Sequence, residues 1–415
     1  MTTDGGSLLP KLTVETRAVH PLASLLPFLD PRRPLVFQRQ GEGIAGIGEA
    51  LRLEFHGPDR ILDAAHAWRS LVTRSEIDDP VQLSGSGLVA FGAFAFDAES
   101  PRTSVLIVPR VVIGMRDGVS FVTRIGGAAD VLVDQPLGPD PQLDLVPGAI
   151  DAETYQAAVA TAVARIRAGE LRKVVLARDV VGRLPAGSDL RHVLTDLSIS
   201  YPDTWTFAID GFLGASPETL VRVSHGDVSA RVLAGSIGRG IDAASDRAAR
   251  VELATTAKEL EEHRYALQSV VSALEPHVSS IEASSEPFAL ELPNLWHLAS
   301  DIEATLGDGS SSLDLVAELH PTAAVAGTPT GAALRLIAEL EPIDRGYYGG
   351  PVGWVDARGD GKWAVALRSA QVEPDGSIRA FAGAGILGDS DPTRELAETR
   401  LKFRPIVDAF GRAKA

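Results

Sequence analysis

The pattern of apolar and polar positions changes about a third of the way along the chain. The first ~145 residues alternate in short runs between glycines and prolines, which predicts strands and turns with one or two helices. A polar, proline-rich stretch from Asp134 to Gln142 then predicts a linker. The strands that follow come in groups, with the helices set apart from them. This order favours an α+β fold with large, mostly antiparallel sheets.

The elements after the linker can be placed from periodicity and end signals. An amphipathic helix is expected from the cap Asp151 to Gly169, with Tyr155, Val159, Val163 and Ile166 on one face. Strands are expected at residues 173–178 and 204–210. A hairpin should join residues 220–223 to residues 228–233 through a turn at Gly226-Asp227. A further helix carries Glu259 and Glu262 and runs to Pro276.

Two acidic repeats lie far apart in the chain, Glu259/Glu262 and Glu395/Glu398. Residues three apart share a helix face, so each repeat presents two carboxylates together, and two facing helices would gather four. Four carboxylates repel unless a cation neutralises them, and oxygen ligands favour Mg²⁺ before Ca²⁺. The repeats also have a structural explanation, since Thr256 and Glu259 could form a capping box and Asp391-Pro392 an N-cap.

Composition and charge exclude several classes of protein. The 415 residues include no cysteine, which rules out disulfides, thiolate zinc sites and a cysteine-type glutaminase in this polypeptide. A net charge of −16 argues against a nucleic-acid partner and means that an anionic substrate needs local cations. The start lacks the features of a leader and no run has the length of a membrane span, so we expect a cytoplasmic protein without a membrane partner.

Two glycine-rich runs match the dinucleotide-binding fingerprint, Gly41 to Gly46 and Gly85 to Ala90. Each run leads into an alternating stretch where that fingerprint requires a helix. The helix N-terminus is what holds the pyrophosphate, so we do not expect dinucleotide binding.

Three charged residues stand where apolar segments start or end. Lys173 opens an apolar strand, Glu218 follows Gly214-Ala-Ser-Pro217 in a turn, and Arg368 ends a further apolar strand. Taken singly, Lys173 is expected to reach water and Glu218 to be exposed. Taken as chemistry, a lysine kept neutral by burial is a base, a turn can aim one carboxyl into a cleft, and a guanidinium fork binds carboxylates.

With these residues in place, the chain resembles the chorismate-utilising enzymes over roughly residues 150–405. The segments that carry the resemblance are Lys173-Val-Val-Leu-Ala-Arg178, Gly214-Ala-Ser-Pro-Glu218, Leu233-Ala-Gly-Ser236, Lys258-Glu-Leu-Glu-Glu-His263, Asn294-Leu-Trp-His-Leu298, His320-Pro-Thr-Ala-Ala-Val-Ala-Gly327, Gly346-Tyr-Tyr-Gly-Gly350, Ala366-Leu-Arg-Ser369, Gly383-Ala-Gly-Ile386 and Glu395-Leu-Ala-Glu-Thr-Arg-Leu-Lys402. The resemblance implies one large α+β domain with two large sheets and outer helices. Residues 1–148 would be a scaffold region of this fold and residues 149–412 its catalytic region, with chorismate as substrate and Mg²⁺ as cofactor.

Single positions indicate which branch of the family the chain is similar to. Relatives that use a glutaminase carry an Arg-Asn-Asp run that is absent from residues 268–274, so no glutaminase subunit is expected. Aminodeoxychorismate synthases have a nucleophilic lysine at the position of Ala234, and anthranilate synthases have glutamine at that of Lys173. Ammonia attacks without a base whereas water needs one, so Lys173 favours water addition. Salicylate synthases have threonine at the position of Ala324, and this segment looks more like the menaquinone-type isochorismate synthases. Ser236 is a departure, since threonine is usual there, but it keeps the hydroxyl.

The resemblance also implies a role for each site residue. Glu262 and Glu398 would hold Mg²⁺, with Glu259 and Glu395 bonded to its waters. Lys173 would be the base that activates water and Glu218 the acid that protonates the departing hydroxyl. The residues that would bind the substrate are Gly235, Ser236, His297, Tyr348, Arg368, Gly383 and Lys402. We therefore expect a monomeric isochorismate synthase serving menaquinone or siderophore biosynthesis, with a salicylate synthase, which also eliminates pyruvate, as the alternative.

Overall fold

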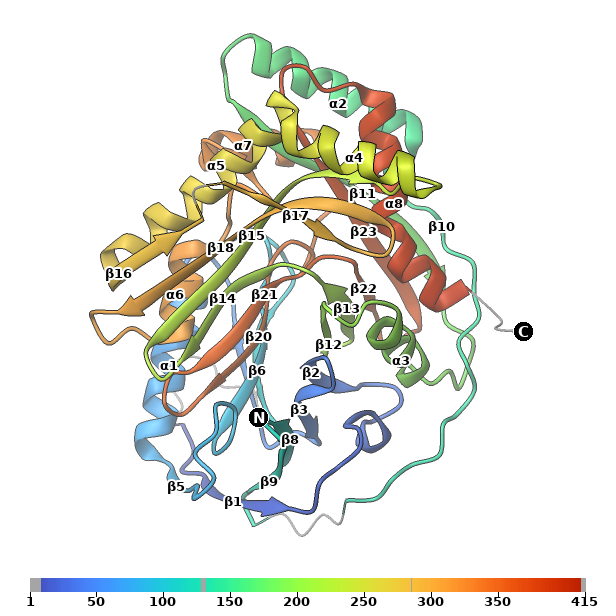
Figure 1. Cartoon of the computed structure of the whole chain (residues 1–415). Coiled ribbons are helices and arrows are strands. Elements are labelled where there is room, and N and C mark those ends of the chain that lie inside the picture. Colours follow the sequence, from blue (N-terminus) through green and yellow to red (C-terminus); the bar gives the residue numbers. More distant parts are fainter. Residues whose placement is uncertain (1–8, 128–131, 285, 412–415) are drawn as a thin grey trace.

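Two large β-sheets face each other, and helices cover their outer faces (Figure 1). The structure is a computed structural model and describes residues 9–127, 132–284 and 286–411. Within these residues the larger sheet has thirteen strands, β1 (Thr13–Val19), β2 (Leu35–Arg39), β3 (Glu42–Ile47), β5 (Glu76–Asp78), β8 (Val111–Arg116), β9 (Val119–Ile125), β10 (Val146–Pro147), β11 (Lys173–Arg183), β12 (Trp205–Ile209), β13 (Phe212–Ser216), β19 (Gly327–Thr328), β22 (Ser369–Val372) and β23 (Ser377–Ile386).

The smaller sheet has ten strands in the same described ranges, β4 (Leu51–Phe55), β6 (Val89–Ala93), β7 (Ser104–Val108), β14 (Thr219–Ser224), β15 (Asp227–Gly238), β16 (Val278–Ala283), β17 (Phe288–Glu291), β18 (Leu295–Leu306), β20 (Pro351–Asp356) and β21 (Gly361–Val365). The helices are α1 (Arg60–Arg74), α2 (Ala152–Arg167), α3 (Arg191–Ser200), α4 (Ala243–Thr255), α5 (Ala257–Leu274), α6 (Ser312–Leu319), α7 (Thr330–Leu340) and α8 (Pro392–Gly411), with 3₁₀ turns η1 (Leu26–Phe28) and η2 (Glu275–His277). No described helix is both long and apolar enough to cross a membrane.

The order of strands joins the two halves of the chain in one domain. The larger sheet runs β10-β11-β23-β22-β13-β12-β2-β3-β8-β9-β1-β5, and the smaller runs β16-β18-β15-β14-β21-β20-β6-β7-β4. The linker region has no regular structure from residue 132 to 145, yet strands from the first 148 residues extend both sheets. Between described strands, only β1 and β5 pair in parallel. The predicted α+β fold with mostly antiparallel sheets and outer helices is confirmed.

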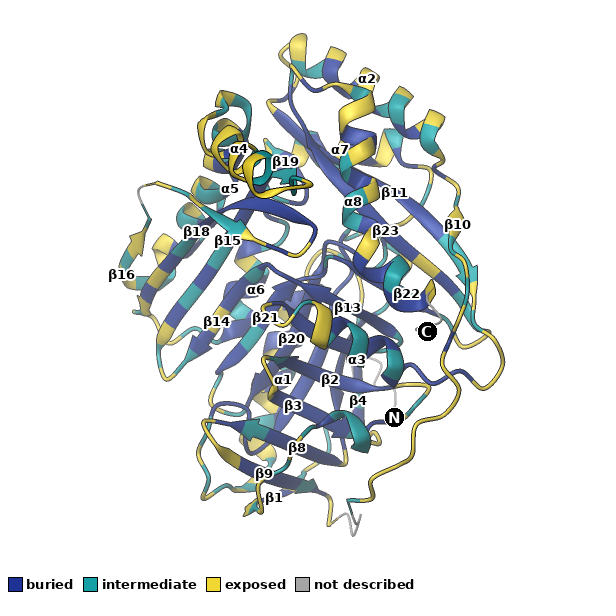
Figure 2. Cartoon of the chain, turned by 45° about the vertical axis from the view of Figure 1, so that its right-hand side comes forward, coloured by how far each residue is buried: buried dark blue, intermediate teal, exposed yellow. Residues whose placement is uncertain are grey.

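Apolar residues fill the space between the sheets and the spaces under the helices. Phe37, Phe91, Phe207 and Trp354 are buried between the two sheets, and the facing strands are dark along most of their length in Figure 2. Helices α3 and α8 cover the outer face of the larger sheet, while α1, α5 and α6 cover the smaller one. Strands β11 and β23 of the larger sheet and β15 of the smaller sheet line one cavity, and the charged residues predicted to form the site lie around it.

Most of the predicted elements form where the sequence places them. Asp151 caps α2 by accepting the Thr154 N–H, and the helix buries Tyr155, Val159 and Val163. Both glycine-rich runs lie in or before strands β3 and β6, so the helix that dinucleotide binding needs does not follow either of them.

The predicted hairpin turn is wrong by one residue. Strands β14 and β15 pair Ser224 with Asp227, so the two-residue turn is His225-Gly226. Both turn residues have positive φ, 53° and 90°, the conformation in which a two-residue turn matches the twist of its strands. Asp227 is therefore already part of the strand.

Candidate active site

A cavity between the two sheets collects nine of the thirteen predicted site residues. Its walls come from β11 and β23 of the larger sheet, β15 and β18 of the smaller sheet, helices α5 and α8, and the loops at residues 217–218, 324–325, 345–348 and 367–368. The predicted residues that line it are Glu218, Gly235, Ser236, Glu262, His297, Tyr348, Arg368, Gly383 and Lys402. Of the other four, Lys173, Glu259 and Glu398 each contact a cavity residue through a hydrogen bond or an ion pair, and Glu395 is linked to Glu259 through Lys258.

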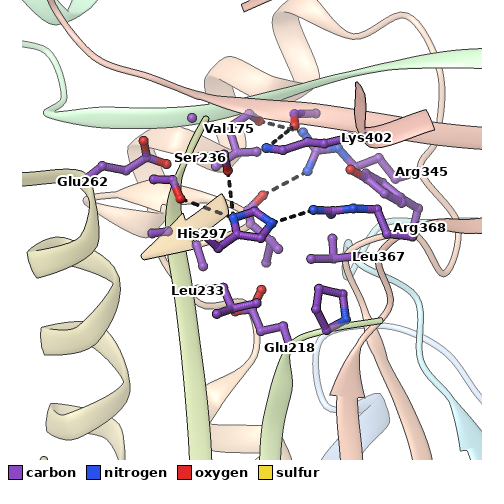
Figure 3. A pocket seen from close by; sticks show the side chains of 18 residues that line it. Val175, Glu218, Leu233, Ser236, Glu262, His297, Arg345, Leu367, Arg368 and Lys402 are labelled. Carbon is purple, nitrogen blue, oxygen red and sulfur yellow. Dashed lines mark hydrogen bonds between the residues drawn. The ribbon is translucent and has the colours of Figure 1, made fainter. Parts of the chain in front are cut away.

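His297 lies at the centre of a chain of hydrogen bonds (Figure 3). Arg368 can only donate, so its Nη2 donates to Nε2 of His297 over 2.8 Å. The ring proton is then on Nδ1, which lies 2.8 Å from Oγ of Ser236 and 3.2 Å from the carbonyl oxygen of Gly235. Burial and the nearby charges of Arg368 and Lys402 lower the pKa of His297 well below its ordinary value, so the ring is neutral. Ser236 accepts from the ring, which leaves its own hydroxyl hydrogen available to a ligand.

Arg368 is held in an unusual backbone conformation. Its φ is +50° and the residue is 7% exposed. Within the described residues its guanidinium meets no carboxylate at ion-pair distance, and a buried unpaired guanidinium is costly. Strain and missing charge compensation together are typical of a residue that binds an anion. Tyr348 lies on the same wall and stacks on Phe381 with 5.2 Å between ring centres.

Glu218 is buried in the cavity, so the expectation of an exposed turn residue is wrong. The residue is 4% exposed, and its N–H donates to Oγ of Ser216, which itself donates to the carbonyl oxygen of Val365. These bonds hold the turn against β21 and direct it inward. Burial raises the pKa of Glu218 to about 8, against the opposing charges of Arg368, Lys173 and Lys402. The carboxyl is therefore protonated at neutral pH and can donate a proton.

Lys173 is also buried, and the expectation of a solvated ammonium is wrong. The residue is 0% exposed because β11 is covered on both faces, and among the described residues its Nζ makes no well-aligned hydrogen bond. Nζ lies 3.2 Å from Oε1 of Glu262, which is close enough for an ion pair but poorly aligned for a hydrogen bond. A buried amine with unused hydrogen-bonding capacity is uncommon in structural lysines and common in reactive ones.

The two acidic helices do face the same region. The capping-box alternative for Glu259 is wrong, since Thr256 makes no side-chain cap and Glu259 accepts the N–H of Ser236 instead, over 3.1 Å. The alternative for the second repeat is confirmed in part, because Asp391 accepts the N–H groups of Thr393 and Arg394 at the start of α8. Neither Glu395 nor Glu398 takes part in that cap.

Charges of both signs surround these carboxylates. Burial and the charge of Glu262 raise the pKa of Glu259 to about 7, and burial and Glu398 raise the pKa of Glu395. Burial by itself would raise the pKa of Glu262, but the ammonium groups of Lys173, Lys258 and Lys402 outweigh it and hold that pKa low. Lys402 pairs with Glu398 over 2.5 Å and donates to the carbonyl oxygen of Gly383 over 3.0 Å.

The donor set fits a hard divalent cation with few protein ligands. Two glycines leave the room that the carboxylates use, since a Cβ at Gly385 would lie 2.1 Å from Oε1 of Glu262 and one at Gly235 would lie 3.0 Å from Oε2 of Glu259. Among the described residues, no three acidic or histidine side chains converge closely enough to enclose an ion by themselves. Mg²⁺ does not need such a cage, because it is usually bound by one or two carboxylates and keeps several waters.

Two charged residues of the site were not predicted from the sequence. Lys258 donates to Glu395 over 2.8 Å, and its position beside Glu259 was the available signal. Arg345 lines the cavity, but its guanidinium donates to Glu341 and to the carbonyl oxygens of Val325 and Val175. It therefore stabilises the cavity wall. The sequence around Arg345 does not predict this role, because the carbonyl oxygens of Val325 and Val175 come from other segments of the chain.

Comparison with known proteins identifies the family of this chain. The family model described as chorismate binding enzyme matches residues 3–124 and 135–411. The isochorismate synthase MenF of Bacillus subtilis is 32% identical over 363 residues, which cover 80% of this chain and 77% of that protein. The salicylate biosynthesis isochorismate synthase of Pseudomonas aeruginosa is 32% identical over 440 residues, covering 97% and 90%.

A solved structure has the same fold at lower identity. The menaquinone-specific isochorismate synthase MenF from Escherichia coli is 23% identical, with a TM-score of 0.79 over 98% of this chain and 96% of that one. The arrangement of sheets and helices is therefore shared along nearly the full length.

Proposed function

Since the chain belongs to the chorismate-binding enzymes, we propose that it is an isochorismate synthase, an isomerase that converts chorismate to isochorismate. The reaction adds water at C2 of the ring, shifts the double bonds and releases the C4 hydroxyl. The observation that carries the proposal is the presence, in one buried site, of a protonated carboxyl at Glu218 and a fully buried amine at Lys173, which lies 3.2 Å from Glu262. Acid–base catalysis requires one group that donates a proton and another that accepts one.

The substrate carries two carboxylates, and the cavity offers donors for both. We assign Arg368, Tyr348, Lys402 and the backbone at Gly383 to carboxylate binding, and Gly235, Ser236 and His297 to the ring. The neutral ring of His297 accepts from Arg368 and donates to Ser236, which keeps the guanidinium and the hydroxyl in place before the substrate arrives. Such preorganisation lowers the cost of binding.

Lys173 and Glu218 divide the proton transfers between them. Lys173 takes a proton from the water that attacks C2, and Glu218 delivers a proton to the hydroxyl that leaves C4. Burial of both side chains keeps bulk water away from these transfers.

The carboxylate cluster supports Mg²⁺ as the cofactor. Glu262 and Glu398 would bind the ion and Glu259 and Glu395 would bond to its waters, which needs only two direct protein ligands. When bound, Mg²⁺ supplies positive charge for the ring carboxylate. Burial and, after it, the neighbouring carboxylates raise the pKa values of Glu259 and Glu395, and a bound cation would favour their charged forms.

Two positions that separate the branches of the family lie on the cavity wall. Ala234 and Ala324 both line the cavity, so neither the covalent lysine of the aminodeoxychorismate synthases nor the threonine of the salicylate synthases can act here. This supports release of isochorismate as the main product. Chromatography of the products after incubation with chorismate and Mg²⁺ tests it, and salicylate plus pyruvate as main products would contradict the proposal.

Replacing Arg368 by lysine is expected to raise KM for chorismate by about ten- to a hundredfold, because a point charge cannot make the two parallel bonds of a guanidinium fork. Steady-state kinetics measure the effect. Arg231→Lys is the matched control, since Arg231 binds Asp301 through two bonds outside the cavity. An unchanged KM in Arg368→Lys would remove Arg368 from the substrate site.

Replacing Glu262 by glutamine is expected to weaken Mg²⁺ binding by at least about tenfold, because it removes one of the two charges assigned to the ion. Isothermal titration calorimetry with Mg²⁺ measures the affinity directly. Glu261→Gln is the control, since Glu261 is exposed on the same helix and bonds to Tyr265. Equal affinities for Glu262→Gln and wild type would show that the metal assignment is wrong. Chelation by EDTA should abolish the activity of the wild type, and added Mg²⁺ should restore that activity.

A further inference from the structure

Lys258 stands between the two acidic helices. It projects from the first turn of α5, donates to Oε1 of Glu395 on α8 over 2.8 Å and lies 3.7 Å from Oε1 of Glu259. The Glu395 side chain is 2% exposed and that of Glu259 is 16% exposed, so water screens the charge of either carboxylate only weakly. The lysine therefore supplies positive charge between one assigned carboxylate of each acidic helix.

Lys258 differs from the other two lysines of the cluster in how it is held. Lys173 lies in the interior of the fold with no exposure, and Lys402 also bonds to the backbone at Gly383. The described contacts of the Lys258 ammonium are to carboxylates alone, and its side chain is 20% exposed. Burial lowers the pKa of Lys258, but Glu395 and Glu259 more than offset it, so the group stays charged. It is the lysine of this cluster that can leave for solvent without opening the core.

We propose that Lys258 is an internal counter-cation, which occupies the carboxylate cluster in the metal-free enzyme and is displaced when a divalent cation binds. The inference rests on the proposed function, since it takes the carboxylates to be the Mg²⁺ site. With Lys173 neutral, as its role as base requires, Lys258 and Lys402 offset two of the four carboxylate charges, and a divalent ion would offset the other two. The ion would compete with the ammonium of Lys258, which contacts the two carboxylates assigned to the waters of the ion, Glu395 and Glu259.

The consequence is a competition that can be measured. A ligand that binds only one conformation has its affinity reduced by the fraction of molecules in that conformation. If the lysine must move aside first, its removal should strengthen Mg²⁺ binding while it destabilises the metal-free protein. A lysine that merely braces the two helices would give the second effect without the first.

The test compares Lys258→Met with wild type by Mg²⁺ calorimetry and by thermal unfolding with and without Mg²⁺. We expect the Kd for Mg²⁺ to fall by about tenfold. The metal-free variant should melt below the wild type, and its gain in Tm on adding Mg²⁺ should be larger. Lys362→Met is the matched control, because Lys362 is another partly buried lysine, on β21, outside the carboxylate cluster. It should leave the Mg²⁺ affinity unchanged.

Lys258→Gln covers the case in which the methionine variant does not fold, since an amide can still donate to Glu395 without carrying charge. It should also bind Mg²⁺ more tightly than wild type. Equal or weaker Mg²⁺ binding by the variants, with normal binding by wild type, would overturn the counter-cation and leave the metal assignment intact. A wild type that does not bind Mg²⁺ at all would overturn both.

Discussion

Replacement of Lys173 by glutamine is expected to slow isochorismate formation by a factor on the order of 10²–10⁴, the usual contribution of a general base. Glutamine keeps the polarity and nearly the length of the side chain but cannot take a proton from water. Its amide can donate to Glu262, which lies 3.2 Å from the lysine nitrogen, so the fold should be retained. The rate of isochorismate formation at saturating chorismate, followed by chromatography, measures the loss of activity.

The same variant should still bind chorismate, since Lys173 is not among the residues assigned to its carboxylates. Calorimetry with chorismate and a thermal melt separate a lost base from a lost site or fold. Lys362→Gln provides the control for removal of a partly buried lysine amine elsewhere. A wild-type rate in Lys173→Gln would show that another group activates the water.

Replacement of Glu218 by glutamine is expected to reduce turnover by a similar factor, on the order of 10²–10⁴, because the hydroxyl at C4 would leave without a proton. The wild-type rate should also depend on pH through this group. The pKa of Glu218 is raised to about 8, so the acid form is populated below that pH and is lost as pH rises through it. The rate should therefore fall on the alkaline side of about pH 8.

Rates of wild type, Glu218→Gln and Glu218→Asp between about pH 6 and 10 test this assignment, since the acid must titrate within that window. Aspartate retains an acid on a shorter side chain and should keep part of the activity and a pH-dependent limb. The glutamine variant should have lost that limb. A wild-type rate that is flat through pH 8, or an active Glu218→Gln, would contradict the role of Glu218 as the acid.

Local signals in the sequence were sufficient for several elements. The cap at Asp151 and the spacing of Tyr155, Val159 and Val163 depend only on neighbours along one helix, and α2 forms as they predict. Local signals do not determine the turn of the hairpin, because the choice between His225-Gly226 and Gly226-Asp227 depends on how β14 and β15 pair along their length. A one-residue shift reverses the faces of a strand, so the packing of the sheet decides the register.

Burial of the charged groups could not be read from local patterns. Each of Lys173 and Glu218 taken singly was expected to reach water, and each is buried because segments far away in the chain cover it. Arg345 shows the same limit, since its partners are Glu341 and carbonyl oxygens on β11 and on the segment before β19. The roles of these residues in catalysis and metal binding remain predictions for the experiments above.

The sequence by itself determined the chemical inventory of this protein: two pairs of carboxylates at helical spacing, a lysine and an arginine at the ends of apolar strands, and no cysteine. These properties are local, so spacing and residue type express them. Only the tertiary structure decided that Glu218 is protonated, that His297 is neutral between Arg368 and Ser236, and that Lys258 sits among the carboxylates. Protonation state and charge compensation depend on desolvation and on distances between groups from different segments, and folding alone sets both.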